Sequence, residues 1–285
     1  MIKFSIGNVS STLFILSWIK FLSVILKVRI RIGGKWTKYF TYGKFGKGLK
    51  NGYDNQTDTN AKMVEDEIKT TSGNADAFQL QLLINRSSAT EKGPVVTLLA
   101  LAINYVNNPF TVDISGIPNE VKHDVPKLYQ HDVPSIGGSI CSITSSTMLM
   151  MYRGYDFTGL ADYPHQYMAG ILKDYGHNIF GNWSYNAIGM GSFGATSYVK
   201  RFYSYQEILF HLYYVGPVSA SIKGTMITDA KTYTTGGHLI VVTGYKIEGS
   251  KIYIYVNDPN IACVSTRCTL ENFLNVNRMV SYIVE

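Results

Sequence analysis

Cys141 is the residue of this chain whose surroundings best suit a nucleophile. A turn-rich polar segment, 132–139, leads into it, and apolar residues at three- and four-residue spacing follow it as far as Gly154. This pattern predicts that Cys141 lies at a helix N-terminus, where the helix dipole and free backbone N–H groups lower the pKa of a thiol. A thiolate there is a candidate nucleophile. A buried structural cysteine on an amphipathic helix is the alternative, and this stretch alone favours neither.

Two later stretches bring partners for a cysteine. Residues 236–245 have the pattern of a strand with His238 near its start, and residues 251–259 that of a second strand ending in Asn-Asp-Pro. Glu-Gly-Ser at 248–250 predicts a hairpin between them. The hairpin brings His238 and Asp258 to the same open end, as direct or diagonal cross-strand neighbours. With the cysteine, they form a Cys–His–Asp constellation suited to nucleophilic catalysis.

These elements, in their order along the chain, resemble the papain-fold cysteine peptidases. Within that fold they are similar to the bacteriocin-processing (double-glycine) peptidase-like family, peptidase family thirty-nine, and its stand-alone secreted bacterial members. The matching residues are Gln130, Cys141-Ser142, Gly237-His238 and Asn257-Asp258-Pro259. The resemblance covers roughly 118–285. It implies that Gln130 supports the oxyanion hole, Cys141 attacks, His238 is the base and Asp258 orients the ring.

The resemblance implies a hydrolase acting on a peptide or protein substrate. A thioester acyl-enzyme would form and be cleared by water, with no cofactor and no metal required. Two alternatives stay open, because one scaffold can host several functions. One is a thiol-dependent amidase or acyltransferase, and the other is a catalytically inactive cell-surface binding protein. We expect a secreted or cell-surface protein of a bacterium, although the sequence contains no clear signal peptide.

The N-terminal part is predicted to be a separate β-domain. Apolar and polar residues alternate in several short segments with turn signals between them, which is typical of a β-sandwich. The predicted strands are 12–18, 21–32, 36–42, 76–85 and 95–104. Their order resembles the jelly-roll-like domain that precedes the peptidase domain in many relatives, and such a domain can bind cell-wall material or a glycan, or only pack.

The predicted fold class is therefore α+β, with two domains. Residues 1–110 form an antiparallel, jelly-roll-like β-sandwich, and residues 118–285 form a papain-like cysteine peptidase domain, joined by an Asn-, Pro- and Gly-rich linker. Three further segments complete the prediction. Residues 61–68 are a strand or a helix, 178–193 are a loop rich in Gly, Asn and aromatics, and 227–235 are a loop that leads to His238.

Composition excludes some classes of protein. A hydrophobic content of 46% rules out a wholly disordered chain, and the net charge of +6 favours acidic surfaces such as cell-wall polymers or phospholipid headgroups. No nucleic-acid-binding motif is present, so nucleic acid is not an expected partner. Lys and Arg interrupt the apolar stretch 13–32 before it reaches the ~20 residues that a spanning helix needs. Cys263 and Cys268 could form a small disulfide or be free thiols, and their spacing is not that of a zinc site.

Overall fold

A computed structural model describes residues 6–13, 23–45, 55–86, 88–90, 96–106 and 111–285. Contacts divide the chain into two compact units, one of residues 1–108 with 173–199, the other of residues 109–172 with 200–285. Strands and helices are mixed in the structure, which confirms the predicted mixture of α and β elements. The domain limits at 110 and 118 and the N-terminal sandwich stay predictions. In the described part of the chain, no helix is long and apolar enough to cross a membrane.

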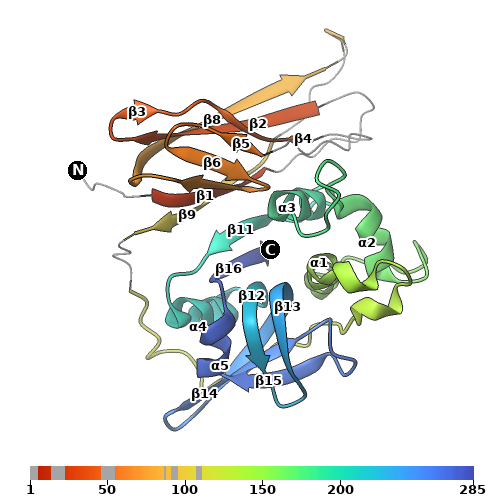
Figure 1. Cartoon of the computed structure of the whole chain (residues 1–285). Coiled ribbons are helices and arrows are strands. Elements are labelled where there is room, and N and C mark those ends of the chain that lie inside the picture. The colour runs from red at the N-terminus through yellow and green to blue at the C-terminus, as the bar shows by residue number, and fades with distance from the viewer. Residues whose placement is uncertain (1–5, 14–22, 46–54, 87, 91–95, 107–110) are drawn as a thin grey trace. The chain divides into compact units, whose positions relative to one another are not determined.

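The first unit is built on an antiparallel sheet (Figure 1). Strand β2 pairs with β8 along its length and with β3 and β4 on its other side, while β1 pairs with β7 and β9. A single bridge between Ile6 and Ala75 connects β1 to β8. Within the described residues the sheet has nine strands: β1 (Ile6–Leu13), β2 (Ser23–Ile32), β3 (Lys35–Trp36), β4 (Phe40–Phe45), β5 (Gln56–Thr57), β6 (Ala61–Val64), β7 (Glu67–Thr70), β8 (Ala75–Asn85) and β9 (Leu99–Tyr105).

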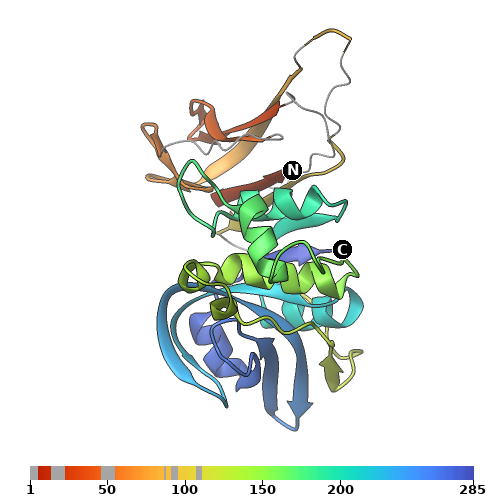
Figure 2. The same ribbon diagram turned by 90° about the vertical axis from the view of Figure 1, so that its right-hand side faces the viewer.

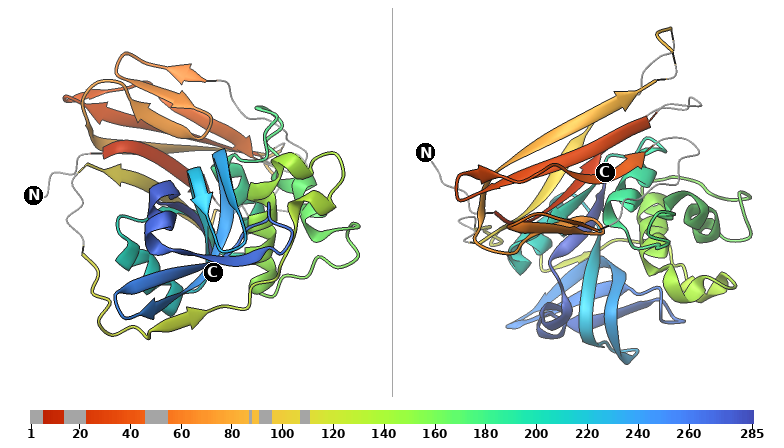
Figure 3. Two further views of the ribbon diagram at one scale, coloured as in Figure 1. Left: turned by 60° about the horizontal axis from the view of Figure 1, so that its bottom comes forward. Right: turned by 45° about the horizontal axis from the view of Figure 1, so that its top comes forward.

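Strand β2 shows why this sequence forms a sheet with one dry face. Its alternate residues are buried in the hydrophobic core of the unit, and the basic residues between them are only half buried. This is the alternation that a half-buried strand requires. Figure 3 shows the long strands β2 and β8 side by side. The buried residues of β2 are Val24, Leu26, Val28, Ile30 and Ile32.

The structure decides one segment that the sequence left open and covers only the start of another. Residues 61–68 are strands, since β6 and β7 form a hairpin with Glu65 in its turn at a φ of 56°. The predicted strand at 12–18 overlaps the end of β1, and its residues 14–18 lie outside the described part of the chain.

Helix α3 (Trp183–Gly191) corrects the prediction of a loop at 178–193. The Gly and Asn content of this stretch hid the helix, because both residues have low helix propensity. Asn182 is the N-cap, and its side chain accepts a hydrogen bond from the N–H of Tyr185. Burial also stabilises the helix, since Ile188 belongs to the core cluster of the sheet and the Tyr185 ring lies 5.0 Å from that of Phe45.

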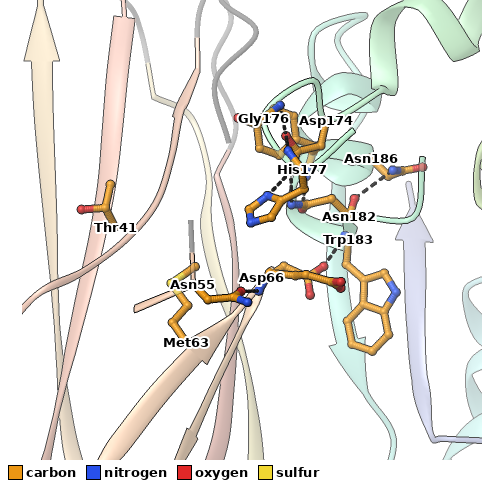
Figure 4. A network of polar contacts seen from close by, with 12 residues as sticks. Thr41, Asn55, Met63, Asp66, Asp174, Gly176, His177, Asn182, Trp183 and Asn186 are labelled. Atoms are coloured by element: carbon orange, nitrogen blue, oxygen red, sulfur yellow. Dashed lines mark hydrogen bonds and ion pairs between the residues drawn. The ribbon is translucent and has the colours of Figure 1, made fainter. Parts of the chain in front are cut away.

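A buried carboxylate holds the start of α3 to the sheet. Asp66, in the β6–β7 turn, accepts a hydrogen bond from the backbone N–H of Trp183 (Figure 4). Burial raises the pKa of Asp66 to about 7; the Trp183 N–H opposes this rise, and the charges of Glu65 and Glu67 add to it. A free N–H at a helix N-terminus is a favourable partner for a carboxylate, so Asp66 orients this helix end as well as contacting it.

Replacing Asp66 with Asn should remove one source of pH dependence from protein stability. The folded-state pKa lies above the ordinary 3.8, so folding binds a proton between pH 4 and 7 and the stabilisation by Asp66 is lost as the pH rises through about 7. The neutral Asn keeps an oxygen for the Trp183 N–H. We therefore expect the thermal midpoint of Asp66→Asn to exceed that of the parent at pH 8 and to approach it at pH 5, measured by circular dichroism. The same difference at both pH values would contradict this role.

The second unit contains an antiparallel sheet with helices packed on it (Figure 2). The strand order is β10-β13-β14-β15, with β12 paired to β13. Helix α1 contacts β13, and α5 contacts β12 and β14. Strand β11 (Ser197–Arg201) contains the boundary between the units. The other described elements of the second unit are β10 (Glu120–Lys122), the short 3₁₀ helices η1 (Gln130–Asp132) and η2 (Gly137–Ser139), α1 (Cys141–Tyr152), α2 (Pro164–Leu172), α4 (Tyr205–Tyr214), β12 (Val218–Ile227), β13 (Thr232–Glu248), β14 (Lys251–Asn257), β15 (Ser265–Thr269), α5 (Leu270–Val276) and β16 (Val280–Val284).

Strand β13 is the long element of this sheet and changes partners along its 17 residues. Its first part pairs with β12, which Figure 3 shows beside it, and its last part pairs with β14 and β10. A bulge at Thr243 marks the change. At Gly244 an added Cβ would lie 2.0 Å from the Val121 carbonyl oxygen, so only glycine permits β10 to approach there. The predicted loop at 227–235 is wrong, because β12 and β13 reduce it to a turn at 228–231.

Helix α1 begins at Cys141 and ends before Gly154, which has a φ of 88°, as the sequence predicts. It is buried on almost every side from Ser142 to Met150. Most of its small hydroxyl side chains have hydrogen-bond acceptors within the protein: Thr144 donates to the Ile140 carbonyl, and Ser145 donates to the Leu239 carbonyl of β13. The buried Ser146 hydroxyl has no hydrogen-bond partner among the described residues. Small residues therefore bring the start of the helix close to β13.

Candidate active site

Cys141, His238 and Asp258 are linked by hydrogen bonds at the meeting point of α1 and the β13–β14 hairpin. The Cys141 side chain is hydrogen-bonded to His238. His238 Nε2 lies 2.8 Å from Asp258 Oδ1, which leaves Nδ1 for the sulfur. His238 is 6% exposed and Asp258 is 0% exposed, whereas Cys141 is half buried. Cys141 is therefore less buried as a residue than its two partners.

The bulge at Thr243 decides which residue of β14 meets His238. Val241 is paired with Asn257, and continuing this register places Asp258 opposite Ile240, on the same face as His238. Without the extra residue the register would shift by one and turn Asn257 toward His238 instead. In the structure the Asn257 amide donates to the Val125 carbonyl at 3.1 Å, so its side chain lies on the face of β14 away from His238.

Asp258 has two further hydrogen-bond donors. The hydroxyl group of Tyr233 donates to Oδ2, and the backbone N–H of Asn260 donates to Oδ1 at 2.9 Å. The Tyr233 ring also lies edge-on to His238, with ring centroids 5.9 Å apart and an interplanar angle of 84°. Tyr233 thus restrains both Asp258 and His238.

Sequence reasoning missed Tyr233. It lies five positions before His238, and regular alternation would put the two side chains on opposite faces of β13. The pairing with β12 contains one extra β13 residue between Thr235 and His238, so the alternation shifts and both side chains reach Asp258. The Gly236-Gly237 pair before His238 was the available signal, because adjacent glycines in a strand pattern often mark a bulge.

The electrostatics favour a charged Cys141–His238 pair. Burial opposes ionisation of Cys141, but the hydrogen bond and charge of His238, with the N–H groups of Leu239 and Ser142, lower the pKa of the thiol below its ordinary value. Burial likewise acts against the charged ring, yet the bonds to Asp258 and Cys141 raise the pKa of His238 to about 9. A thiolate beside an imidazolium is therefore the favoured state near neutral pH.

The structure places Gln130 in η1, next to the turns that lead into α1. Its backbone N–H donates to the Pro259 carbonyl at 2.9 Å, and its side-chain Nε2 donates to the Gly137 carbonyl at 2.8 Å. At Gly137 an added Cβ would lie 2.7 Å from the Gln130 carbonyl oxygen, so this close approach requires glycine. Gln130 therefore connects the segment after Asp258 to the approach of Cys141.

The other two cysteines lie apart from this arrangement. Both are free thiols in the structure. Cys268 is buried in β15, where burial raises the pKa of its thiol to about 12. Cys263 is exposed, and its sulfur lies 3.7 Å from the Ser265 carbonyl oxygen. Among the described residues, no group of three or more His, Cys, Asp or Glu side chains is arranged to hold a metal ion.

The model of the peptidase C39-like family matches residues 122–282, which is more than half of the chain. The chain therefore belongs to the peptidase C39-like family. Among solved structures, it is similar to a Bacillus anthracis protein provisionally described as a C39-like peptidase, with a TM-score of 0.40 and 15% sequence identity over 58% of this chain and 98% of that one. No curated protein matches the chain. Membership of this family points to a peptidase that uses a cysteine.

Tyr233→Phe should reduce the reactivity of Cys141 by roughly 3- to 10-fold, because a hydrogen bond to a charged group contributes about 1.5–3 kcal/mol and part of that restrains the His238 ring. The measurement is the rate of Cys141 alkylation as a function of pH. A merely structural role would lower thermal stability without moving the pH profile. Thr234→Val, which removes a neighbouring exposed hydroxyl that is hydrogen-bonded to Thr225, is the matched control.

Cys141 should react with iodoacetamide near pH 6 before Cys263 and Cys268 react, because its histidine partner lowers the pKa of its thiol. His238→Ala should slow this labelling at pH 6 by about 10-fold for each pKa unit that the thiol regains. At pH 9, Cys141 of this variant should be alkylated nearly as fast as Cys141 of the parent. Adducts are mapped by mass spectrometry, and preferential labelling of Cys263 or Cys268 in the parent would count against Cys141 as the nucleophile.

Proposed function

We propose that this protein is a cysteine peptidase that hydrolyses peptide bonds through Cys141, His238 and Asp258. The observation that carries the proposal is the hydrogen-bonded chain from the half-buried Cys141 through His238 to the fully buried Asp258. A structural cysteine would need neither a histidine partner nor a buried carboxylate behind it, so the constellation supports nucleophilic catalysis over the structural alternative. Family membership supports the same chemistry.

In the proposed reaction, the Cys141 sulfur attacks the carbonyl carbon of the scissile bond and forms a tetrahedral intermediate. The negative oxygen accepts hydrogen bonds from the Cys141 backbone N–H and the Gln130 side chain. Gln130 can do this because the bond to Gly137 uses only one of its two amide protons. His238 then protonates the leaving amine, and the C–N bond breaks to give a thioester. Water, deprotonated by His238, attacks the thioester and releases the acid and the Cys141 thiol.

Asp258 acts through His238 and touches no substrate in this mechanism. It accepts the Nε2 proton of the ring and fixes the orientation that aims Nδ1 at the sulfur. Tyr233 and Asn260 hold the carboxylate in turn. Because His238 has a pKa of about 9, the imidazolium needed to protonate the leaving amine is present at neutral pH and is lost as the pH rises through about 9.

Substitutions of His238 and Asp258 should distinguish the residue that acts as general base from the residue that orients its ring. His238→Ala should lower turnover by ~10²–10⁴, because the general base is lost. Asp258→Asn should retain much of the activity, since its amide oxygen still accepts the Nε2 proton of an imidazolium, and Asp258→Ala should lose more. Asn257→Ala is the control, because Asn257 bonds to Val125 instead of His238. Turnover of a peptide identified by library digestion measures all four, and a crippled Asn257→Ala beside an active Asp258→Ala would refute this assignment.

The same experiment addresses the finer parts of the proposal. Cleavage of peptide-library members by the parent, and its absence in Cys141→Ala, would support hydrolysis of peptide bonds. Products in which an added amine replaces water would instead indicate an acyltransferase. Thiol labelling without any turnover would indicate a binding protein. We further propose a papain-like fold for residues 118–285, a β-sandwich for residues 1–110, and a secreted or cell-surface location.

A further inference from the structure

The positive charge of the chain is concentrated in its first 108 residues. Residues 1–108 contain 14 Lys and Arg against 7 Asp and Glu, for a net charge of +7, whereas residues 109–285 contain 12 against 13, for a net charge of −1. The C-terminal part that carries Cys141 is thus nearly neutral. Such a segregated charge favours the binding of anionic partners to the N-terminal part.

Three of these cations form a row on one face of β2, which we call the cationic stripe: Lys27, Arg29 and Arg31. They alternate with the buried core residues of the strand, so they lie on the face of the sheet opposite the core. Alternate residues of a strand are roughly 6.6 Å apart. On β8, Gln81 is paired with Lys27 and Gln79 with Arg29, which borders the stripe with amides instead of carboxylates.

Arg29 is held rigidly at the middle of the cationic stripe. Its guanidinium carbon lies 4.9 Å from the centroid of the Trp36 ring and 4.7 Å from that of Tyr39, and its Nε donates to Gln79 Oε1 at 2.7 Å. In the described part of the chain, its two terminal nitrogens have no hydrogen-bond acceptor and Lys27 has no carboxylate partner. Arg31 is paired with the exposed Asp76. Lys27 and the oriented guanidinium of Arg29 are therefore available to a ligand.

The chemistry of the stripe selects among anionic partners. A face of each aromatic ring is already covered by Arg29, which disfavours a neutral sugar that stacks on the rings. The cations follow one strand instead of spreading over an area, which suits a chain better than a membrane. A chain with phosphates in its backbone keeps every charge on one line, and the planar guanidinium of Arg binds phosphate through two hydrogen bonds.

We propose that the cationic stripe binds an extended phosphodiester-linked polymer, with successive phosphates held by Lys27 and Arg29. This specifies the cell-wall contact that is one of the alternatives for the N-terminal part, the other being packing alone, and it is independent of the peptidase chemistry. The amide groups of Gln79 and Gln81 are placed to hydrogen-bond the hydroxyl groups of the polymer beside each phosphate.

The test is binding of poly(glycerol phosphate) to the full-length protein, measured by calorimetry at 50 and 200 mM salt. Lys27→Gln/Arg29→Gln should weaken binding by at least 10-fold at 50 mM salt. It should also flatten the slope of log affinity against log salt by about 1.4, the value for two lost phosphate contacts to a single-stranded polyanion. The matched control is Lys62→Gln/Lys69→Gln, which removes the same charge from the β6–β7 hairpin and should change affinity less than 3-fold.

Three results would overturn the proposal. One is equal weakening in the control variant, which would mean that only net charge matters. Another is binding of anionic phospholipid vesicles or poly(glutamate) as tightly as poly(glycerol phosphate), and the last is absence of binding by the parent. If circular dichroism shows that the double variant is misfolded, Lys27→Gln and Arg29→Lys replace it, and each should weaken binding about 3-fold. Iodoacetamide labelling of Cys141 should be unchanged in every stripe variant, so this test and that of the peptidase fail separately.

Discussion

Asp258 is a carboxylate with no exposure to solvent, and burying an ionised group is costly unless its oxygens are hydrogen-bonded. Its partners are His238, the hydroxyl of Tyr233 and the backbone N–H of Asn260. Burial raises the pKa of Asp258, but these bonds outweigh it and keep the pKa below its ordinary value. The charge of His238 depends on that ionised carboxylate, and the lowered pKa of the Cys141 thiol depends in turn on His238.

Strand β13 supplies the geometry on which this chain of interactions rests. It carries both Tyr233 and His238, contacts the start of α1, and pairs with the strand that ends before Asp258. Two irregularities act together. The extra residue between Thr235 and His238 brings Tyr233 to the same side as His238, and the bulge at Thr243 turns Asp258, instead of Asn257, toward the ring. A slip of one residue at either place would exchange the faces.

The first unit shows how a buried charge can also organise structure away from the thiol. Segment 173–199 is distant in sequence from the N-terminal sheet, yet α3 contributes Ile188 to the core of that sheet. Asp66 receives the Trp183 N–H at the start of this helix, and Asp174 accepts hydrogen bonds from His177 and Asn182 just before it. Asp66 thereby satisfies an N–H that the start of a helix leaves free, and Asp174 connects two side chains of the segment that precedes the helix. The other face of the same sheet carries the cationic stripe.

The sequence by itself determined the features that depend on local pattern. Alternation identified β2, apolar spacing and Gly154 identified α1 with Cys141 at its start, and the Gly-Ser turn predicted the hairpin that brings His238 and Asp258 together. Order and spacing of a few residues also indicated the family. These signals are readable because they arise from neighbours in the chain.

Only the tertiary structure decided the rest. Helix α3 was missed because burial against a distant sheet stabilises it despite its Gly and Asn content. Tyr233 was missed because the effect of a bulge on side-chain direction depends on pairing with another strand. The raised pKa of Asp66 and the contacts of Arg29 with the rings of Trp36 and Tyr39 likewise come from tertiary packing. Packing between residues that are distant in sequence determines the surroundings of each charged group, so local sequence patterns cannot predict those surroundings.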